Sequence, residues 1–191
     1  FANIRTPSTQ RGQFISDNSG KIRFFVGYRK KDIVADVYQY DRDEPAIRRW
    51  KLFDSRKIGK DEDISVLGFS HDNEKVYLDV TQPEGPDAVY VHEFSSGEST
   101  LLFKDDNVDP GHVLLSPITG GVIAIGFLDG KPRIQFTDPD DGFAIDTERL
   151  QKQLPGMEVF VTSHTSNGKL AVVYATSDKT PGDFWLYNRD S

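Results

Sequence analysis

The sequence predicts an all-β fold, and three observations support this prediction. Phe, Tyr and Trp make up 12% of the 191 residues and are accompanied by 16 Gly and 10 Pro, a composition that favours strands joined by turns. Hydrophobic residues at 37% and charged residues at 28% are typical of a globular domain. A turn-like motif also recurs four times along the chain.

The recurring motif is a short polar turn between two apolar segments. Its copies begin at Ser16, Ser70, Ser116 and His164, so the spacings are 54, 46 and 48 residues. Each copy follows a short apolar stretch and precedes a longer one that alternates in the manner of a strand. The longer predicted strands are Ile22 to Tyr28, Val76 to Thr81, Val122 to Leu128 and Leu170 to Thr176.

Further strands complete the repeat. A third strand is expected in every copy, at Val34 to Asp41, Ala88 to Phe94, Arg133 to Asp138 and Phe184 to Asn188. A fourth is visible in two copies, at Arg48 to Phe53 and Ser99 to Phe103. Four strands repeated about every 48 residues are typical of a β-propeller blade.

The predicted architecture is therefore a partial β-propeller of about 3.5–4 four-stranded antiparallel blades. The chain is expected to be a single propeller fragment, 1–191, with blades at roughly 10–55, 62–105, 110–154 and 156–191. A β-sandwich with regularly spaced strands is the alternative that spacing alone leaves open.

One segment departs from the strand pattern. Residues Asp146 to Leu154 are rich in helix formers and are followed by Pro155 and Gly156, which stop a helix. The sequence predicts a short helix near 147–154 in the outer region of the third blade, with Asp146 as its N-cap.

The ends of the chain fall in the middle of the repeat. Phe1 to Ile4 resembles the outer strand of a preceding blade, and the last copy lacks its outer strand. Exposed strand edges and apolar sheet faces promote association. We therefore expect self-association through the open blade ends.

Several segments together resemble a known family. They are Asp17 to Arg23, Gly68 to Ser70, Lys75 to Tyr77, Ala88 to Tyr90, Ser96 to Glu98, Leu154 to Gly156 and Pro181 to Tyr187. In this order they resemble the propeller domain of bacterial prolyl oligopeptidase-family serine peptidases, the relatives of acylaminoacyl peptidase and dipeptidyl aminopeptidase.

The resemblance implies a role for the chain. A complete relative would continue past Ser191 into a catalytic α/β-hydrolase domain with a Ser, Asp and His triad, which is absent from this chain. The expected function is then that of a non-catalytic segment that restricts or guides peptides to that downstream domain. The alternative is a free-standing propeller that recognises proteins or carbohydrates, because one fold serves many functions.

No catalytic residue is predicted. A nucleophile elbow requires Gly-x-Ser-x-Gly, and no serine in the sequence meets that pattern. The nearest segment runs from Gly68 to Asp72, where Ser70, His71 and Asp72 are consecutive. Consecutive strand side chains point apart, so these three cannot form a triad among themselves. Whether the parent protein is an enzyme stays open at this stage.

No metal or cofactor site is predicted either. The sequence has no Cys, and His71, His92, His112 and His164 are widely scattered. Asp138 to Gly142 has some features of a calcium loop, but position 149, which should be Glu, is Arg. A hydrated turn is the preferred interpretation. Trp50, Tyr90, Trp185 and Tyr187 are expected to pack between blades rather than line a ligand groove.

Charge and hydropathy limit the partners and the location. A net charge of −7 opposes the phosphate backbone, and the basic clusters at Arg29 to Lys31 and Arg48 to Arg49 are short, so nucleic acid is not expected. The longest apolar run, Gly121 to Leu128, is too short to span a membrane. A chain without Cys suits the cytosol or the periplasm, and only the family resemblance favours an exported, periplasmic parent.

Overall fold

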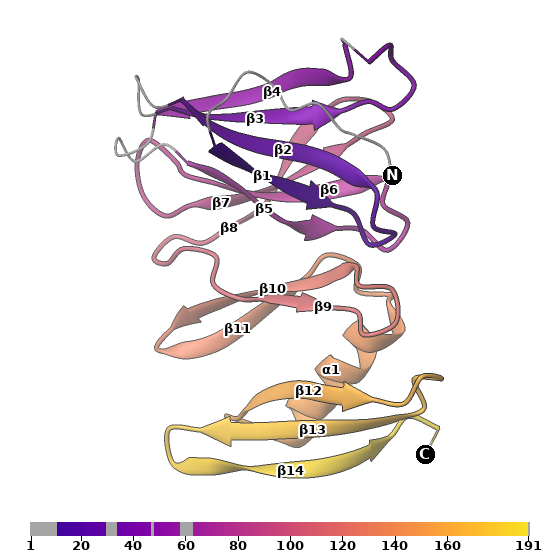
Figure 1. Ribbon diagram of the computed structural model, residues 1–191. Helices are drawn as coiled ribbons and strands as arrows, with labels where there is room; N and C mark the ends of the chain where they lie inside the picture. The colour runs from indigo at the N-terminus through magenta and orange to yellow at the C-terminus, as the bar shows by residue number, and fades with distance from the viewer. Residues whose placement is uncertain (1–10, 30–33, 47, 58–62, 191) are drawn as a thin grey trace. The chain divides into compact units, whose positions relative to one another are not determined.

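The computed structural model describes residues 11–29, 34–46, 48–57 and 63–190, which form four antiparallel sheets and one helix (Figure 1). The chain divides into two compact units, unit 1 at 1–107 and unit 2 at 108–191. Among the described residues, no helix is both long and apolar enough to cross a membrane.

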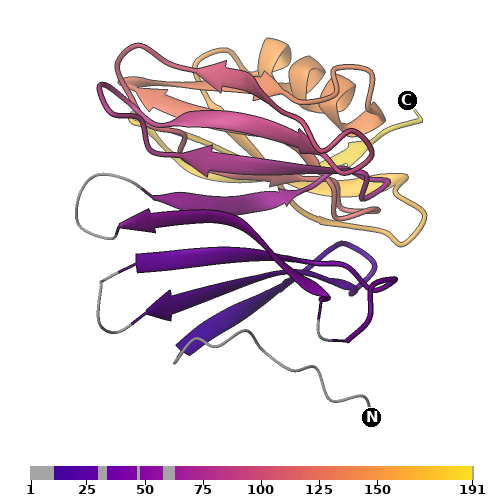
Figure 2. The same cartoon turned by 90° about the horizontal axis from the view of Figure 1, so that it is seen from above.

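Unit 1 contains two four-stranded sheets, each with its strands in sequence order. The first sheet comprises β1 (Arg11–Ser16), β2 (Ile22–Arg29), β3 (Val34–Tyr40) and β4 (Trp50–Lys57). The second comprises β5 (Ile64–Phe69), β6 (Lys75–Val80), β7 (Ala88–Glu93) and β8 (Ser99–Lys104). This up-and-down order is that of a propeller blade, and Figure 2 shows the strands of each sheet side by side.

Unit 2 contains two three-stranded sheets and the helix. Strands β9 (Val113–Leu115), β10 (Val122–Asp129) and β11 (Lys131–Phe136) form one sheet. Strands β12 (Glu158–His164), β13 (Leu170–Ser177) and β14 (Thr180–Asn188) form the other. Helix α1 (Gly142–Gln153) joins the two and contacts β10 and β12.

The predicted all-β fold with antiparallel blades and one short helix is confirmed, with corrections of detail. The last strand begins at Thr180, four residues before the predicted start, because the β13–β14 hairpin is tight. The helix begins at Gly142, and its N-cap is Asp141, whose carboxylate accepts from the backbone N–H groups of Phe143 (2.8 Å) and Ala144 (3.3 Å). The prediction that Asp146 is the N-cap was wrong. The N-cap, Asp141, belongs to the segment Asp138 to Gly142, which the sequence analysis interprets as a hydrated turn.

Two predictions have no test in the described residues. The outer strand expected at Phe1 to Ile4 lies outside them. The arrangement of all blades as one continuous propeller fragment over 1–191 stays a prediction.

The four recurring turns are real and share one geometry. The backbone N–H groups of Asp17, Ser70, Ser116 and Thr165 donate across the hairpin to residues four or five positions later, over 2.7–3.0 Å. Each turn needs one residue with positive φ: Gly20, Gly120 and Gly168 supply it in three copies and Asn73 in the other.

The core of unit 1 is aromatic and joins its two sheets. Phe24 of β2 is fully buried, and its ring centroid lies 5.4 Å from that of Phe53, 6.2 Å from Phe69 and 6.0 Å from Phe94. Burial of such a ring stabilises a fold by about 2–3 kcal/mol. The two sheets of unit 1 are therefore packed face to face through this cluster.

The core of unit 2 is built on α1. Leu150 of the helix packs with Val159, Val173 and Ala175 of the β12–β14 sheet, all of them buried. Side chains alternate along a strand, so the residues next to these point away from α1. That opposite face is strongly exposed at β14, where Phe184 is 69% and Leu186 73% exposed.

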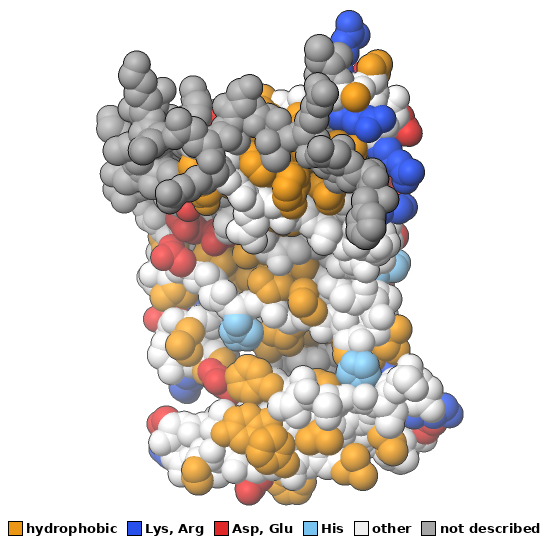
Figure 3. Space-filling view, viewed as in Figure 1, with side chains coloured by type: hydrophobic (Ala, Val, Ile, Leu, Met, Phe, Trp, Pro, Cys, Tyr) orange, Lys and Arg blue, Asp and Glu red, His pale blue; other side chains and the backbone are white. Residues whose placement is uncertain are grey.

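The aromatic predictions had mixed outcomes. Trp50 packs with Phe25 and Tyr40, at centroid distances of 5.8 and 4.8 Å, as expected for a core residue. Trp185, in contrast, is 52% exposed on β14. Figure 3 shows hydrophobic side chains gathered on the surface over β12–β14.

Candidate functional site

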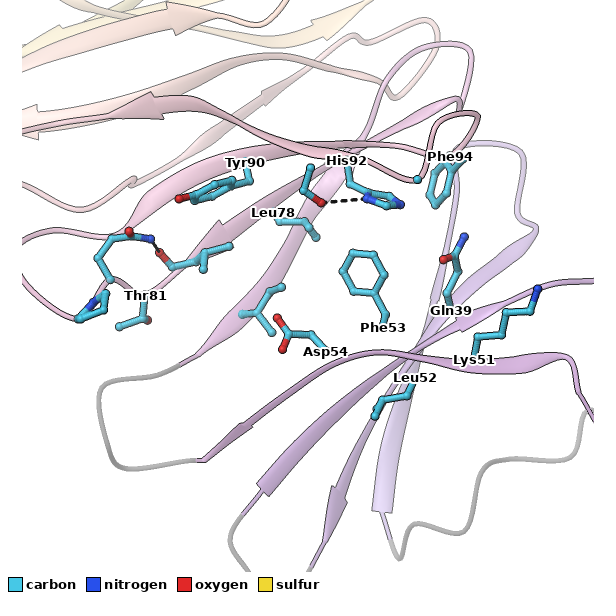
Figure 4. Close-up of a pocket in the computed structure, with 16 residues that line it drawn as sticks. Gln39, Lys51, Leu52, Phe53, Asp54, Leu78, Thr81, Tyr90, His92 and Phe94 are labelled. Atoms are coloured by element: carbon cyan, nitrogen blue, oxygen red, sulfur yellow. Dashed lines mark hydrogen bonds between the residues drawn. The ribbon is translucent and has the colours of Figure 1, made fainter.

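A cavity of about 730 Å³ lies between the two sheets of unit 1 (Figure 4). Strands β3 to β8 and the loop after β6 contribute to its lining. Its interior combines aromatic and aliphatic walls with a few polar groups. This is the composition expected of a binding site for an organic ligand.

The apolar walls come from three strands and the loop that follows one of them. Phe53 of β4, Leu78 of β6, and Tyr90 and Phe94 from β7 and its following turn all line the cavity. In β4 the register with β3 shifts at Phe53, which is an extra residue opposite Tyr38. Such a bulge redirects side chains, and Figure 4 shows the Phe53 ring rising from β4 toward Leu78 and His92.

His92 is the buried polar group of this site. Its side chain is hydrogen-bonded to Ser99, with 2.9 Å between Nδ1 and Oγ, as the dashed line in Figure 4 shows. Its ring stands edge-on to Phe53 and Phe94, at centroid distances of 4.8 and 5.5 Å. Burial lowers the pKa of His92 below its usual value, so the imidazole is neutral near pH 7.

Charged groups lie on one side of the cavity. Lys51 of β4 pairs with Asp41 (3.0 Å) and Glu44 (3.4 Å). The hydrogen bonds to Asp41 and Glu44 raise the pKa of Lys51, and the bond from Lys51 lowers the pKa of Asp41. Asp54 is the carboxylate within the lining.

The arrangement is suited to binding rather than to acyl transfer. Ser99 and His92 are hydrogen-bonded, but a base whose pKa is lowered is a weak acceptor for a serine proton. No carboxylate among the described residues is hydrogen-bonded to His92 to orient it in the manner of a triad. The neutral imidazole and hydroxyl instead offer hydrogen bonds to a ligand.

The serine, histidine and aspartate that are adjacent in sequence stand in a turn. The Ser70 hydroxyl donates to Asp72 over 2.5 Å and accepts from the backbone N–H of Lys75 over 3.0 Å. His71 is exposed beside them. These side chains close the β5–β6 hairpin, in the recurring position that the sequence indicated.

The structure also shows where the candidate metal ligands lie. His71, His92, His112 and His164 belong to four different strands or turns. No three His, Asp or Glu side chains in the described ranges gather into a group that could hold a metal ion. In the loop before α1, Asp138 accepts from the backbone of Asp140 over 3.1 Å.

Sequence reasoning did not find the cavity. The alternation of Val89, Tyr90, Val91 and His92 was recognised as a strand, but His92 was considered only as a metal ligand. No feature of the sequence around Phe53 predicts the bulge. A histidine on the apolar face of a strand, next to Phe94, was the available signal.

Comparison with known proteins yields distant relatives. No protein-family model matches the chain. Over 142 residues it is 25% identical to dipeptidyl aminopeptidase BIII of Pseudoxanthomonas mexicana, a match covering 74% of this chain and 20% of that protein. The structure aligns with TolB from Acinetobacter baumannii at a TM-score of 0.49 and 15% identity, over 94% of this chain and 42% of the TolB chain.

The chain thus has a distant similarity to a dipeptidyl aminopeptidase, of which it spans one fifth of the length. What the whole protein does is therefore a matter for proposal.

Proposed function

We propose that this chain is a non-catalytic propeller segment of a serine-type peptidase. It would restrict or guide the access of peptides to an α/β-hydrolase active site in the same polypeptide. The observation that carries this proposal is the 142-residue match to dipeptidyl aminopeptidase BIII. The partners in this proposal are the hydrolase domain and the peptide substrates of the parent.

The chemistry of the chain is consistent with a non-catalytic role. No serine in the sequence stands in a Gly-x-Ser-x-Gly motif, which an α/β-hydrolase nucleophile requires. In the hydrogen-bonded pair of Ser99 and His92 that borders the cavity, the pKa of the histidine is lowered. The cavity supplies a surface on which a peptide could be held.

The reading frame of the parent gene tests this proposal. We expect it to continue for about 250 residues, the size of a hydrolase domain, and to encode a nucleophile elbow. Replacing the elbow serine by alanine in that longer protein should abolish peptide hydrolysis while residues 11–190 keep their fold, as judged by circular dichroism. A frame that closes near Ser191 would overturn the proposal.

A free-standing binding propeller is the second candidate, and the cavity between the sheets of unit 1 favours it. In that case recognition of a ligand would be the whole function. The two candidates differ in the reading frame, because only the peptidase requires a hydrolase domain.

We also propose that the chain self-associates through the exposed face of β12–β14. Phe160, Tyr174 and Phe184 are cross-strand neighbours on this face, with successive ring centroids 6.5 and 4.9 Å apart. A contiguous apolar face of this kind favours association in water.

A further inference from the structure

One asparagine of the chain precedes a glycine. It is Asn167, in the turn between β12 and β13, and no other Asn-Gly pair occurs in the sequence. An asparagine side chain loses its amide when the backbone nitrogen of the next residue attacks it, and glycine hinders that attack least because it has no side chain. Asn167 is also exposed to solvent. Both features favour deamidation at this position.

Asn167 has a defined role in its turn. Its Oδ1 accepts from the Thr165 hydroxyl over 2.7 Å and from the backbone N–H of Lys169 over 3.1 Å. The Thr165 hydroxyl oxygen in turn accepts from the backbone N–H of Leu170 over 3.1 Å. Gly168 follows Asn167 with a φ of 67°, in the left-handed region that glycine tolerates. An oxygen acceptor at position 167 therefore helps to close the hairpin.

The β5–β6 turn has the same geometry with an aspartate in place of the asparagine. Asp72 Oδ1 accepts from the Ser70 hydroxyl over 2.5 Å and from the backbone N–H of Glu74 over 3.0 Å. The next residue, Asn73, has a φ of 62°. The bond from Ser70 lowers the pKa of Asp72, so this turn stabilises a charged carboxylate. An aspartate at position 167 can form the same bonds, and hydrogen bonds to a charged acceptor are stronger than those to a neutral one.

The charges around Asn167 also accommodate a carboxylate. Asn167 lines a cavity of about 470 Å³ in unit 2. The charged side chains that line this cavity are Arg149, Lys169, Arg189, Asp146 and Asp190. Three cations thus accompany two carboxylates, and a third carboxylate would balance the charge. Attraction between opposite charges therefore adds to the stability of the deamidated turn.

The folded turn shields its own amide. The attacking atom, the backbone nitrogen of Gly168, donates its hydrogen to the carbonyl of Thr165 over 2.8 Å. The amide oxygen of Asn167 is held by two donors. Attack on the side chain therefore requires the turn to open locally. Gly168 is also buried, and a Cβ built on it would lie 2.7 Å from Cδ1 of Ile118, so an isoaspartate, which adds a carbon atom to the main chain, does not fit this turn.

We propose that Asn167 is a deamidation site at which the folded turn slows the reaction and accepts its aspartate product. The nitrogen of Gly168 attacks Cγ of Asn167 and loses its proton to water, and the side-chain amide leaves as ammonia. Water then opens the resulting succinimide. Cleavage between the ring nitrogen and Cγ gives aspartate, and cleavage between that nitrogen and the main-chain carbonyl carbon gives isoaspartate. The net reaction consumes water and releases ammonia, and no atom is oxidised or reduced. This inference does not rest on the proposed function.

The test is peptide mapping by mass spectrometry of the 191-residue chain aged in mildly alkaline buffer, with one sample folded and the other in urea. In urea we expect Asn167 to convert before Asn107 and Asn188, which precede larger residues. In the folded sample Asn167 should convert more slowly by at least about tenfold, because the turn must open first.

Three results of this mapping would overturn the proposal. Earlier conversion of Asn107 or Asn188 in urea would show that Asn167 is not the reactive asparagine. Equal rates at Asn167 in the two samples would show that the turn gives no shielding. A folded chain that keeps its amide at Asn167 through prolonged ageing would show that the site is closed in the folded protein.

A variant of the turn tests the source of the shielding. Thr165→Val removes the hydroxyl that holds Asn167 and should speed conversion in the folded chain by about fivefold, the effect of one hydrogen bond, with no change in urea. Thr162→Val is the matched control, because its hydroxyl donates within the same hairpin to the carbonyl of Val172 over 3.1 Å. Equal rates in the two folded variants would contradict the proposal.

The product can be examined directly. Asn167→Asp should unfold at a denaturant concentration no lower than that of the wild type, whereas the reverse change in the other turn, Asp72→Asn, should lower it. Mapping of the aged samples should also give a smaller fraction of isoaspartate from the folded chain than from the chain in urea. A less stable Asn167→Asp, or a larger isoaspartate fraction from the folded chain, would contradict the claim that the turn accepts aspartate.

Discussion

Units 1 and 2 each contain an arginine held between a carboxylate and an aromatic ring, but the two arginines connect different elements. In unit 1, Arg23 donates to Asp17 over 3.2 Å and its guanidinium lies 3.9 Å from the ring centroid of Phe94. In unit 2, Arg189 donates to Asp146 and lies 4.1 Å from the ring centroid of Phe143. The same chemistry links sheet to sheet in unit 1 and helix to sheet in unit 2.

The contacts of Arg23 join the turns of two sheets. Arg23 also donates to the carbonyl of Asn73 over 3.1 Å, and Asn18 bonds to Asn73 and Ser70, each over 2.9 Å. Sheets β1–β4 and β5–β8 are therefore held together by these polar contacts and by the packing of Phe24. The cavity occupies part of the space that these contacts leave between the sheets.

The contacts of Arg189 in unit 2 instead hold helix α1 against the β12–β14 sheet. Asp146 accepts from Tyr187 over 3.0 Å as well as from Arg189. Burial and the bond to Asp146 raise the pKa of Tyr187. Helix α1 thus covers one face of β12–β14. On the other face Phe160 contacts His112, with 6.2 Å between ring centroids, and Phe184 and Leu186 are exposed. The comparison teaches that the same arginine contact can hold two sheets together, as in unit 1, or hold a helix on a sheet, as in unit 2.

The largest expected effect is at the aromatic core of unit 1. Phe24→Ala should destabilise this unit by about 3–5 kcal/mol, because it leaves a cavity among the three rings of Phe53, Phe69 and Phe94. Denaturant unfolding followed by tryptophan fluorescence of Trp50 would measure this. Phe184→Ala on the exposed face is the control and should change the stability by about 0.5 kcal/mol or less. Similar losses for both would contradict the assignment of the core.

The two arginines should contribute different amounts to the free energy of unfolding. Arg23→Ala should cost about 2–3 kcal/mol, because it leaves a buried carboxylate without its cation. Arg189→Ala should cost less, about 1–2 kcal/mol, since the Asp146 side chain is 12% exposed and that of Asp17 only 1%. Chemical denaturation of both variants checks the order. A larger loss in Arg189→Ala would contradict this account.

Acid should weaken unit 1 through Asp17. Burial alone would raise the pKa of Asp17, but hydrogen bonds from Ser19, Lys21 and Arg23 outweigh it and lower the pKa below 3.8. A lowered pKa means that the stabilisation is full above the unfolded value and is lost as pH falls through the folded one. Asp17→Asn should therefore flatten the decline in stability below about pH 4. A decline of stability at low pH that is the same in Asp17→Asn as in the wild type would refute this.

His92 should make stability depend on pH in a higher range than Asp17 does. Burial lowers its pKa below 6.5, so the unfolded chain binds the proton more readily than the folded one. Its contribution to stability is complete above that value and is lost as pH falls below it. Thermal unfolding between about pH 7 and 5 should show a decline that His92→Gln reduces. A decline of the same size in the variant would exclude His92 as its source.

The smallest effect on stability is expected at the exposed face of β12–β14 in unit 2. A substitution there should instead change the oligomeric state. Leu186→Glu places a charge on an exposed position and should shift sedimentation toward monomer without loss of stability. Leu101→Glu, the same change at an exposed leucine of β8 in unit 1, is the control. A wild-type chain that stays monomeric at high concentration would refute self-association.

Much of the fold could be predicted from the sequence, because the blade signal is local. The turns around Asp17, Ser70, Ser116 and Thr165 are encoded by small and polar residues a few positions apart. The helix was recognised from its stop at Pro155, but its start was misplaced. Asp146 has the chemistry of a cap, yet tertiary bonds to Tyr187 and Arg189 use it instead.

The candidate site could not be predicted in the same way. It depends on the bulge at Phe53 and on the approach of β4 to β7, whose nearest ends, Lys57 and Ala88, are 31 positions apart in sequence. His92 carries no local sign of its contact with Phe53. A site made by the packing of two sheets is visible only once the sheets are placed.

The most direct test of the central claim is the rate of hydrolysis of a chromogenic dipeptide substrate by the 191-residue chain and by a longer chain that includes the following reading frame. We predict no turnover above background for the 191-residue chain and clear turnover for the longer one, abolished by alanine at its elbow serine. Turnover by the purified 191-residue chain, or an inactive longer chain that is well folded, would contradict the account.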